Sequence, residues 1–327
     1  MNDMTRRDRI RSSVTLLAII LCFAITNSIM TSSVYAQQPQ YSFVTKWGSN
    51  GIGFGEFSQP IEIAIDSAGN VYLTDFTSVA NKVQKFTTNG TFITSWGSLG
   101  FGNGYFSNPI GLAVDSSSNL YIADFGNPDT AVQKFTTNGT FITSWGSTGL
   151  GDGQFINPAG LAVDSSGNVY VGDFGENNRV QKFDSNGDFI TNWGTPGTGD
   201  GQFITPSDIT VDSKGNVYVA DGGNNRVQKF DSNGNFITKW GTPGTGDGQF
   251  ASPAGITVDS SDNLYVTDTG NDSIQKFDSN GNFITKWGSS GSSDGQFLDP
   301  LGIAVDSAGN VYVVDSGNSR VQVFAPS

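Results

Sequence analysis

Six Trp-Gly pairs recur along the chain at nearly constant spacing, and this repeat constrains the fold more than any other feature. The six tryptophans stand 49, 49, 48, 47 and 47 residues apart, at Trp47, Trp96, Trp145, Trp193, Trp240 and Trp287. A period of this length is typical of architectures that copy one supersecondary unit. Residues 206–241 show that unit clearly.

Four short segments of this unit are rich in β-branched and aromatic residues and are bounded by Gly, Asn, Asp or Ser. They are residues 209–211, 216–221, 226–230 and 236–240, and each is expected to be a β-strand. The turn sequences DSKGN and DSNGN place Asn or Gly where a tight hairpin requires positive φ. Six such meanders around an axis predict an all-β fold, a six-bladed β-propeller of four-stranded blades.

The two ends of the repeat predict how the ring closes. Residues 43–47 match the fourth strand of the unit, whereas the last copy stops after its third strand at residues 320–324. We therefore expect residues 43–47 to pair with residues 321–324, so that an N-terminal strand closes the ring and no sheet edge stays open there. Residues 37–327 are expected to form this single propeller domain.

The N-terminal segment has the features of a secretory signal peptide. Four arginines at residues 6–11 precede an apolar run at residues 14–25, and a small-residue cleavage site follows at residues 34–36. The run is shorter than the roughly 20 residues that span a bilayer. We expect residues 1–36 to be removed and the protein to be secreted or extracytoplasmic, without stable membrane insertion; retention as an anchor is the alternative.

Composition disfavours several classes of function. The net charge is −13, and four arginines against two aspartates in the leader leave −15 on the rest, which argues against nucleic acid as a partner. The chain has no histidine, which is the commonest general base and transition-metal ligand, and its one cysteine, Cys22, lies in the leader. We expect a monomer without enzymatic activity and without a required cofactor.

The repeat resembles the NHL repeat, a family of six-bladed propellers, in the elements PxGIAVD, GNVYVAD and GNNRVQKF. The resemblance covers all six copies and is most complete at residues 206–230. NHL propellers serve as protein-binding and RNA-binding modules and as sensor or surface domains, so the resemblance implies a binding function. Similar six-bladed lyases depend on histidines, which this chain does not have.

Two acidic residues interrupt the repeat at positions that are otherwise glycine. The second residue after the proline that every copy contains is Glu62 in the first copy and Asp208 in the fourth. These two copies lie opposite each other in a ring of six. Both are expected near the mouth of the central channel, where two carboxylates could share Ca²⁺. This predicts the alternative function, a calcium-dependent hydrolase or lactonase similar to six-bladed enzymes with an axial metal. A solvated rim charge is the other interpretation.

A second departure divides the ring into two halves. Five residues after the Trp, the first three copies carry Ile52, Phe101 and Leu150, where the last three carry Thr or Ser; the residue after the repeated Asp is Phe76, Phe125 and Phe174, against Gly, Thr and Ser. Because these loops emerge on the same face of a propeller, we expect an apolar surface that binds a protein or glycan partner. Packing between loops, or recent duplication of the polar copies, would also explain the contrast.

The aspartate repeated in each copy is expected to be structural, and the role of three glycosylation sequons is left open. One Asp per copy ends the second strand, and we expect it to cap its own loop and to pair with a nearby Arg. Glycosylation sequons at Asn89, Asn138 and Asn271 make glycan attachment an open expectation for an exported chain.

Overall fold

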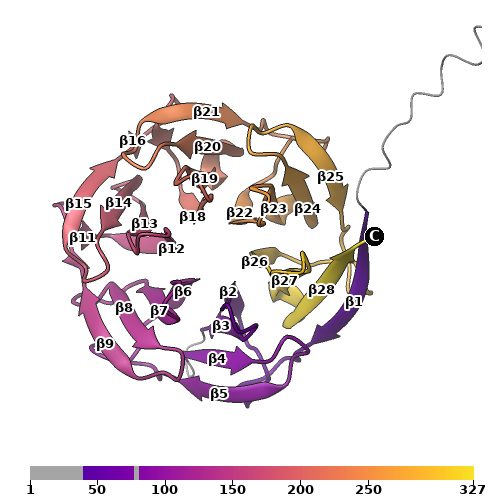
Figure 1. The fold of residues 1–327 in the computed structure, drawn as a ribbon, viewed down its shortest axis with the longest axis horizontal. Coiled ribbons are helices and arrows are strands. Elements are labelled where there is room, and N and C mark those ends of the chain that lie inside the picture. The colour runs from indigo at the N-terminus through magenta and orange to yellow at the C-terminus, as the bar shows by residue number, and fades with distance from the viewer. Residues whose placement is uncertain (1–39, 77–80) are drawn as a thin grey trace, which may run out of the picture. The chain divides into compact units, whose positions relative to one another are not determined.

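The computed structural model describes residues 40–76 and 81–327, and this part of the chain forms six blades around a central axis (Figure 1). Each blade is an antiparallel sheet of four strands, with the first strand nearest the axis and the fourth on the outer wall. The six-bladed β-propeller predicted from the repeat is therefore confirmed.

The first three blades use strands in chain order. Blade 1 comprises β2 (Pro60–Ile65), β3 (Val71–Asp75), β4 (Lys82–Phe86) and β5 (Phe92–Trp96); blade 2 comprises β6 (Pro109–Val114), β7 (Asn119–Asp124), β8 (Val132–Thr136) and β9 (Phe141–Trp145); blade 3 comprises β12 (Asn157–Val163), β13 (Val169–Phe174), β14 (Arg179–Phe183) and β15 (Phe189–Trp193). Two connections contain short parallel pairs, β10 (Ser147–Thr148) with β11 (Gln154–Phe155) and β16 (Thr195–Pro196) with β17 (Gln202–Phe203).

The last three blades also carry a 3₁₀ turn between their second and third strands. Blade 4 comprises β18 (Pro206–Val211), β19 (Val217–Asp221), η1 (Gly222–Asn224), β20 (Arg226–Phe230) and β21 (Phe236–Trp240); blade 5 comprises β22 (Pro253–Val258), β23 (Leu264–Asp268), η2 (Thr269–Asn271), β24 (Ser273–Phe277) and β25 (Phe283–Trp287); blade 6 comprises β26 (Pro300–Val305), β27 (Val311–Asp315), η3 (Ser316–Asn318), β28 (Arg320–Pro326) and β1 (Tyr41–Trp47).

The hairpin turns follow from local chemistry, as the DSKGN turn of blade 4 shows. The Asp212 carboxylate accepts hydrogen bonds from the backbone N–H groups of Lys214 and Asn216 at 2.9 and 2.8 Å. Gly215 has a φ of 82°, a conformation that costs glycine little and other residues more. The turn sequence therefore sets the register of β18 against β19.

The ring closes between the two ends of the repeat. Strand β1 pairs antiparallel with β28, with Phe43 opposite Phe324 and Trp47 opposite Val321 (Figure 1). The predicted pairing of residues 43–47 with residues 321–324 is confirmed. Blade 6 therefore contains one strand from the N-terminal side and three from the C-terminal end.

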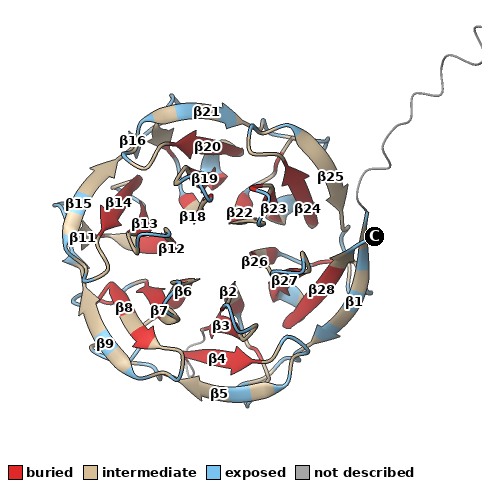
Figure 2. Cartoon of the chain, viewed as in Figure 1, coloured by how far each residue is buried: buried red, intermediate tan, exposed pale blue. Residues whose placement is uncertain are grey.

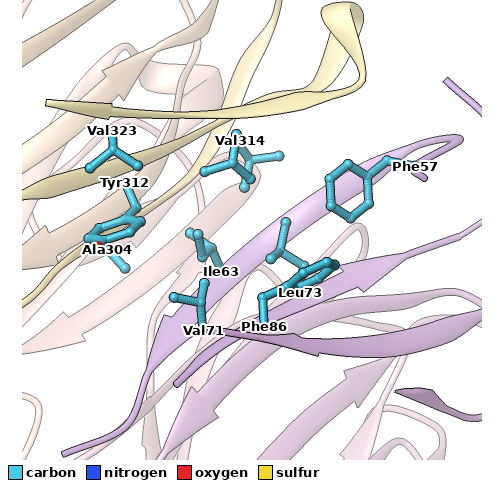
Figure 3. Close-up of a cluster of buried hydrophobic side chains, with 10 residues drawn as sticks. Phe57, Ile63, Val71, Leu73, Phe86, Ala304, Tyr312, Val314 and Val323 are labelled. Atoms are coloured by element: carbon cyan, nitrogen blue, oxygen red, sulfur yellow. The ribbon is translucent and has the colours of Figure 1, made fainter. Parts of the chain in front are cut away.

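The hydrophobic core lies between neighbouring blades, and six clusters repeat around the ring. Buried stretches lie mainly on the inner strands of the blades, and the outermost strands are intermediate or exposed (Figure 2). At the seam, Phe57 and Phe86 of the blade 1 side meet Tyr312 of blade 6 in one cluster (Figure 3). The Trp47 ring lies 4.6 Å from the Phe86 ring between centroids. Burying one such side chain stabilises a fold by about 1.5–3 kcal/mol, so the aromatic wedges between blades hold the ring together.

A polar ladder also joins consecutive blades. In blade 1 the Tyr72 hydroxyl donates to Asp66 at 2.8 Å, and Lys85 lies over the Tyr72 ring at 5.3 Å. The Lys85 Nζ then donates to the carbonyl of Thr137 in the next blade at 3.2 Å. The lysines that repeat this arrangement against their own tyrosines are Lys134, Lys182, Lys229 and Lys276. These cations are structural, because each is held between an aromatic ring and a neighbouring blade or terminal strand.

Among residues 40–76 and 81–327, no helix is long and apolar enough to cross a membrane. The predicted signal peptide at residues 1–36 lies outside the described residues.

Candidate functional site

The repeated aspartates at the ends of the second strands organise the loops of one face. Asp221 is fully buried, accepts the backbone N–H of Ile204 at 2.9 Å, and pairs with the Arg226 guanidinium at 2.7 Å. Asp124 is equally buried but has only N–H and amide donors, and burial raises its pKa to about 6. These acids therefore tie the connection that leads into their blade to the scaffold. The expected pairing with a nearby Arg is confirmed at Asp221 and Asp315, but the expected cap is wrong, because Asp221 makes no side-chain cap hydrogen bond to the turn that follows it.

Glycine lets the innermost strands of neighbouring blades approach closely. A Cβ atom at Gly160 on β12 would lie 2.3 Å from the Asp208 Cα on β18, and one at Gly111 on β6 would lie 2.0 Å from the Ala159 carbonyl oxygen. A side chain at these positions would force the blades apart. Where a copy keeps this glycine, its inner strand can therefore lie close to the inner strand of the next blade.

Glu62 and Asp208 replace this glycine on opposite blades, and the channel contains two cavities beside them. One cavity of about 180 Å³ is lined by the rest of the inner strands, and the other, of about 190 Å³, opens beside Phe174; both acids line both cavities. We call the second cavity the channel mouth. Its apolar wall comprises Ile61, Ile110, Ala159, Phe174, Ala254 and Leu301. The structure thus brings together the two acids that the sequence singled out.

Backbone N–H groups of the inner strands hold both carboxyl groups. Asp208 Oδ2 accepts the N–H of Ile256 in the next blade at 2.8 Å, and Glu62 Oε1 accepts its neighbour, the Ile63 N–H, at 3.0 Å. Burial raises the pKa of both acids, and the Asp208 charge raises the pKa of Glu62 further. Two like charges in one buried site favour retention of a proton.

This arrangement is a poor match for the expected calcium site. Ca²⁺ takes six to eight oxygen ligands, whereas the channel offers two carboxyl groups that already accept backbone N–H bonds. Within residues 40–76 and 81–327, no group of three or more Asp, Glu, Cys or His residues could hold a metal ion. Calcium binding at Glu62 and Asp208 stays a prediction, and the donor set gives it little support.

Large apolar side chains are exposed in the connections that lead into blades 1, 2 and 3. They are Ile52 at 61%, Phe54 at 76%, Leu99 at 52%, Phe101 at 65%, Tyr105 at 50% and Leu150 at 57% exposure, and we call them the apolar rim. The sequence comparison found Ile52, Phe101 and Leu150 but missed Leu99 and Tyr105. A position-by-position reading of the whole connection would have found both, because the polar copies carry Pro or Ser at the Leu99 position and Gln at the Tyr105 position.

The three phenylalanines after the repeated aspartates lie differently from the apolar rim. Phe76, Phe125 and Phe174 are half-buried, and the Phe125 and Phe174 rings stack at 5.9 Å between centroids with an interplanar angle of 4°. Phe174 lines the channel mouth. The Phe125 N–H donates to the Asn108 carbonyl of the connection into blade 2, so the two kinds of loop meet as expected. Part of each ring is already packed within the fold.

The three sequons differ in accessibility. Asn89 and Asn138 are exposed at hairpin turns between third and fourth strands. The Asn271 amide instead donates to Asp268 at 2.7 Å and to the Gly244 carbonyl at 2.9 Å. A glycan on Asn271 would replace one of the two amide hydrogens and so remove at least one of these bonds, which makes Asn89 and Asn138 the better acceptors.

The ring of six four-stranded blades defines the chain as a six-bladed β-propeller. Four segments match the NHL repeat, at residues 155–183, 203–230, 250–277 and 297–324, and together with the ring they place the chain among the NHL-repeat propellers. The matched segments cover the last residues of the connections, from the repeated Phe onward, and the first three strands of blades 3 to 6. No curated protein matches the chain in sequence.

Several solved structures share the fold at low sequence identity. A Bacteroides thetaiotaomicron protein of unknown function is 18% identical, with a TM-score of 0.65 over 89% of this chain and 76% of its own. An auxiliary nutrient binding protein from the same organism is 15% identical, with a TM-score of 0.63 over 88% and 73%. Virginiamycin B lyase from Staphylococcus aureus is 14% identical, with a TM-score of 0.58 over 88% and 99%. At these identities the likeness concerns the fold.

Proposed function

We propose that this chain is an exported binding module that docks a protein partner on the apolar rim. The observation that carries the proposal is the rim itself: six large apolar side chains are at least half exposed in three consecutive connections. Exposed apolar groups that cluster in this way mark contact surfaces, and interface cores favour aromatic anchors. The corresponding positions after the Trp in the other three connections are Thr198, Thr245 and Ser292.

The loops that carry the rim are rigid, which suits a preformed interface. In the connection into blade 1, the Gly51 N–H donates to the Phe57 carbonyl and the Phe57 N–H donates to the Ser49 carbonyl. The Lys82 Nζ donates to the Ile52 and Gly53 carbonyls at 2.9 and 2.8 Å. Phe54 stacks on Phe92 of the outer strand β5 at 4.9 Å. Because these bonds fix the loop, its exposed side chains do not lose much conformational entropy when a partner covers them.

The outer wall beside the rim is also less charged than the opposite side. Strands β21, β25 and β1 carry Lys239, Lys286 and Lys46, and each lysine pairs with an aspartate at 3.7 Å or less. The equivalent residues on β5 and β9 are Ser95 and Ser144. Lysines on exposed strand edges oppose association, so their absence beside the rim favours a protein contact there.

The test uses residues that the propeller already tolerates at equivalent positions. The triple variant Ile52→Thr, Phe101→Thr, Leu150→Ser copies the polar connections, so its melting temperature should stay close to that of the wild type. A photoreactive phenylalanine analogue at position 101 should cross-link a partner in the native extracellular setting, whereas the same analogue at position 245 should not. Fully burying each apolar side chain contributes about 1.5–3 kcal/mol, so the triple variant should abolish a micromolar complex.

Two results would contradict the proposal. Equal cross-linking from positions 101 and 245 would place the interface elsewhere. Cross-linking or capture of a carbohydrate in place of a protein would make the rim a glycan-binding surface.

A further inference from the structure

The channel mouth combines apolar walls with an acidic floor. Its wall residues include Ile61, Ile110, Leu301 and the Phe174 ring, and Glu62 and Asp208 line both the channel mouth and the other channel cavity. Its volume of about 190 Å³ exceeds the roughly 150 Å³ of an engineered apolar cavity that accommodates benzene. A ligand of five or six heavy atoms therefore has room.

The two acids lack a cationic partner, whereas five of the nine other buried aspartates in the described part of the chain have one. Asp221 and Asp315 each pair with an arginine, and Asp75 lies 3.9 Å from the Lys82 Nζ. In the described part of the chain, no lysine or arginine pairs with Glu62 or Asp208, and none lines either cavity. A buried carboxylate that opens on a cavity without a counter-charge is costly to the folded state, and an incoming cation would offset that cost.

We propose that the channel mouth binds a primary ammonium group carried on an apolar stem. The stem packs against Ile61, Ile110 and Leu301, and the ammonium group donates to the carboxyl groups of Glu62 and Asp208. Two sources share this chemistry: a free alkylamine, or a lysine side chain of a docked protein. The lysine source rests on the proposed function, because it requires a protein docked on the face that carries the apolar rim, and Phe174 joins the channel mouth to that face. The free alkylamine does not depend on the proposed function.

The chemistry of the site favours an ammonium group over other charged ligands. Its three N–H donors match acceptor oxygens, and a straight stem suits a narrow apolar wall. A carboxylate or phosphate would meet two acids of its own sign. A metal ion would need several more oxygen ligands than the two carboxyl groups provide.

Proton release gives the site a specific pH signature. Burial and mutual repulsion raise the pKa of both acids, so at neutral pH the pair retains a proton that an ammonium group would displace. Among residues 40–76 and 81–327, no other Asp, Glu, Lys, Arg or Tyr lines either channel cavity, so the signal belongs to this pair. Affinity should therefore rise from pH 5 to pH 8, while an alkylamine stays protonated below its pKa of about 10.4.

The experiment compares butylamine with 1-butanol, which has the same number of heavy atoms but no charge. Isothermal titration of the purified protein at pH 8 should give saturable butylamine binding with a dissociation constant on the order of 1 mM, and at least tenfold weaker binding of butanol. The double variant Glu62→Gln, Asp208→Asn should lose at least tenfold in butylamine affinity. Ala254→Phe narrows the channel mouth and leaves both acids in place, and this variant should also lose butylamine affinity.

The control variant Asp129→Asn, Asp188→Asn removes two exposed charges and should bind butylamine as the wild type does. Absence of saturable butylamine binding at pH 8, or equal binding in the Glu62 and Asp208 double variant, would overturn the proposal. Binding of Ca²⁺ that excludes butylamine would replace it with a metal site.

A competition experiment distinguishes a free amine from a lysine of a docked protein, and the channel site from the apolar-rim interface. Butylamine should compete with partner cross-linking at position 101 if the partner inserts a lysine, and should leave it unchanged if the ligand is a free amine. The apolar-rim variant Ile52→Thr, Phe101→Thr, Leu150→Ser should keep butylamine affinity even where it loses the partner. Failure of the channel site is thereby distinguishable from failure of the protein interface.

Discussion

Blades 1–3 and blades 4–6 bury the same kinds of side chain between blades but differ in the loops of one face. Tyr72 and Tyr218, at equivalent positions in blades 1 and 4, are both fully buried. The loop between second and third strands spans Asp75 to Lys82 in blade 1 but only Asp221 to Arg226 in blade 4, where a 3₁₀ turn fills it. The connections of the first half expose the apolar rim. Those of the second half carry Thr or Ser five residues after the Trp, and among their large apolar side chains they expose only Ile204 and Leu298, at 40% and 41%.

The contrast shows which parts of a repeat are free to diverge. A change in the Trp, Phe and Tyr wedges would open the contact between two blades, so these residues stay alike in every copy. Loops are partly exposed to solvent, even where they touch the next blade, so they can lengthen or become apolar at small cost to stability. The apolar loops of blades 1–3 therefore indicate that the functional surface lies on that half.

The largest expected effect comes from opening the ring where the two halves meet. Deleting Tyr41–Trp47 removes the outer strand of blade 6 and the Trp47 wedge against Phe86. Replacing one buried Trp by Ala costs about 3–5 kcal/mol, and loss of the whole strand should exceed that. Thermal unfolding should show a large fall in melting temperature; a truncated chain that melts with the intact one would contradict closure by β1.

A second test compares how tightly each half holds its loops. Arg226 in blade 4 pairs with Asp221 and also donates to the carbonyls of Thr198, Gly199 and Gln202. Breaking a buried pair on one side costs about 3–5 kcal/mol, so Arg226→Met should destabilise strongly in urea unfolding.

The matched change in blade 3 is Arg179→Met. The Arg179 Nε lies 3.6 Å from Asp173, and its NH2 group donates to two carbonyls, so a smaller loss is expected. Equal losses for the two variants would show that the loops of both halves are held with similar strength.

The half-buried phenylalanines test whether the first half can adopt the polar loops of the second. Phe76→Ser, Phe125→Thr, Phe174→Gly copies the residues of blades 4–6 and removes the Phe125–Phe174 stack. Because each ring is only partly buried, each change should cost less than the about 3–5 kcal/mol of a fully buried Phe→Ala change. We expect a modest fall in melting temperature together with lost partner cross-linking. A collapse of stability would make these rings part of the core.

The smallest effect concerns the two acids that stand in opposite halves. Burial raises the pKa of Glu62, so above an ordinary carboxyl pKa of about 4 the unfolded chain releases a proton that the folded chain retains. Stability therefore falls as pH rises from that value, and Glu62→Gln should remove its share of the loss. The variant should melt above the wild type at pH 8, with the difference shrinking toward pH 4; the same difference at both pH values would contradict the shifted pKa.

Most of the fold could be predicted because the signals are local and repeated. The Trp period gives the number of blades, the DSKGN type of turn gives the hairpins, and the unmatched strands at the two ends give the closure of β1 onto β28. The positions of Glu62 and Asp208 in the channel also followed from the repeat, since every copy places the residue after Pro-X on an inner strand.

The sequence by itself determined the six-bladed architecture, the two acids that replace glycine and the apolar loop residues of blades 1–3. The tertiary structure decided which groups these residues contact. The backbone N–H of Ile256 that holds Asp208 comes from the next blade, and the stack of Phe125 on Phe174 joins two blades. Such contacts depend on the distance and twist between blades, which no local pattern encodes. Exposure of Phe101 and partial burial of Phe174 therefore emerged only once the blades were packed, because burial is a property of neighbours brought together by the whole ring.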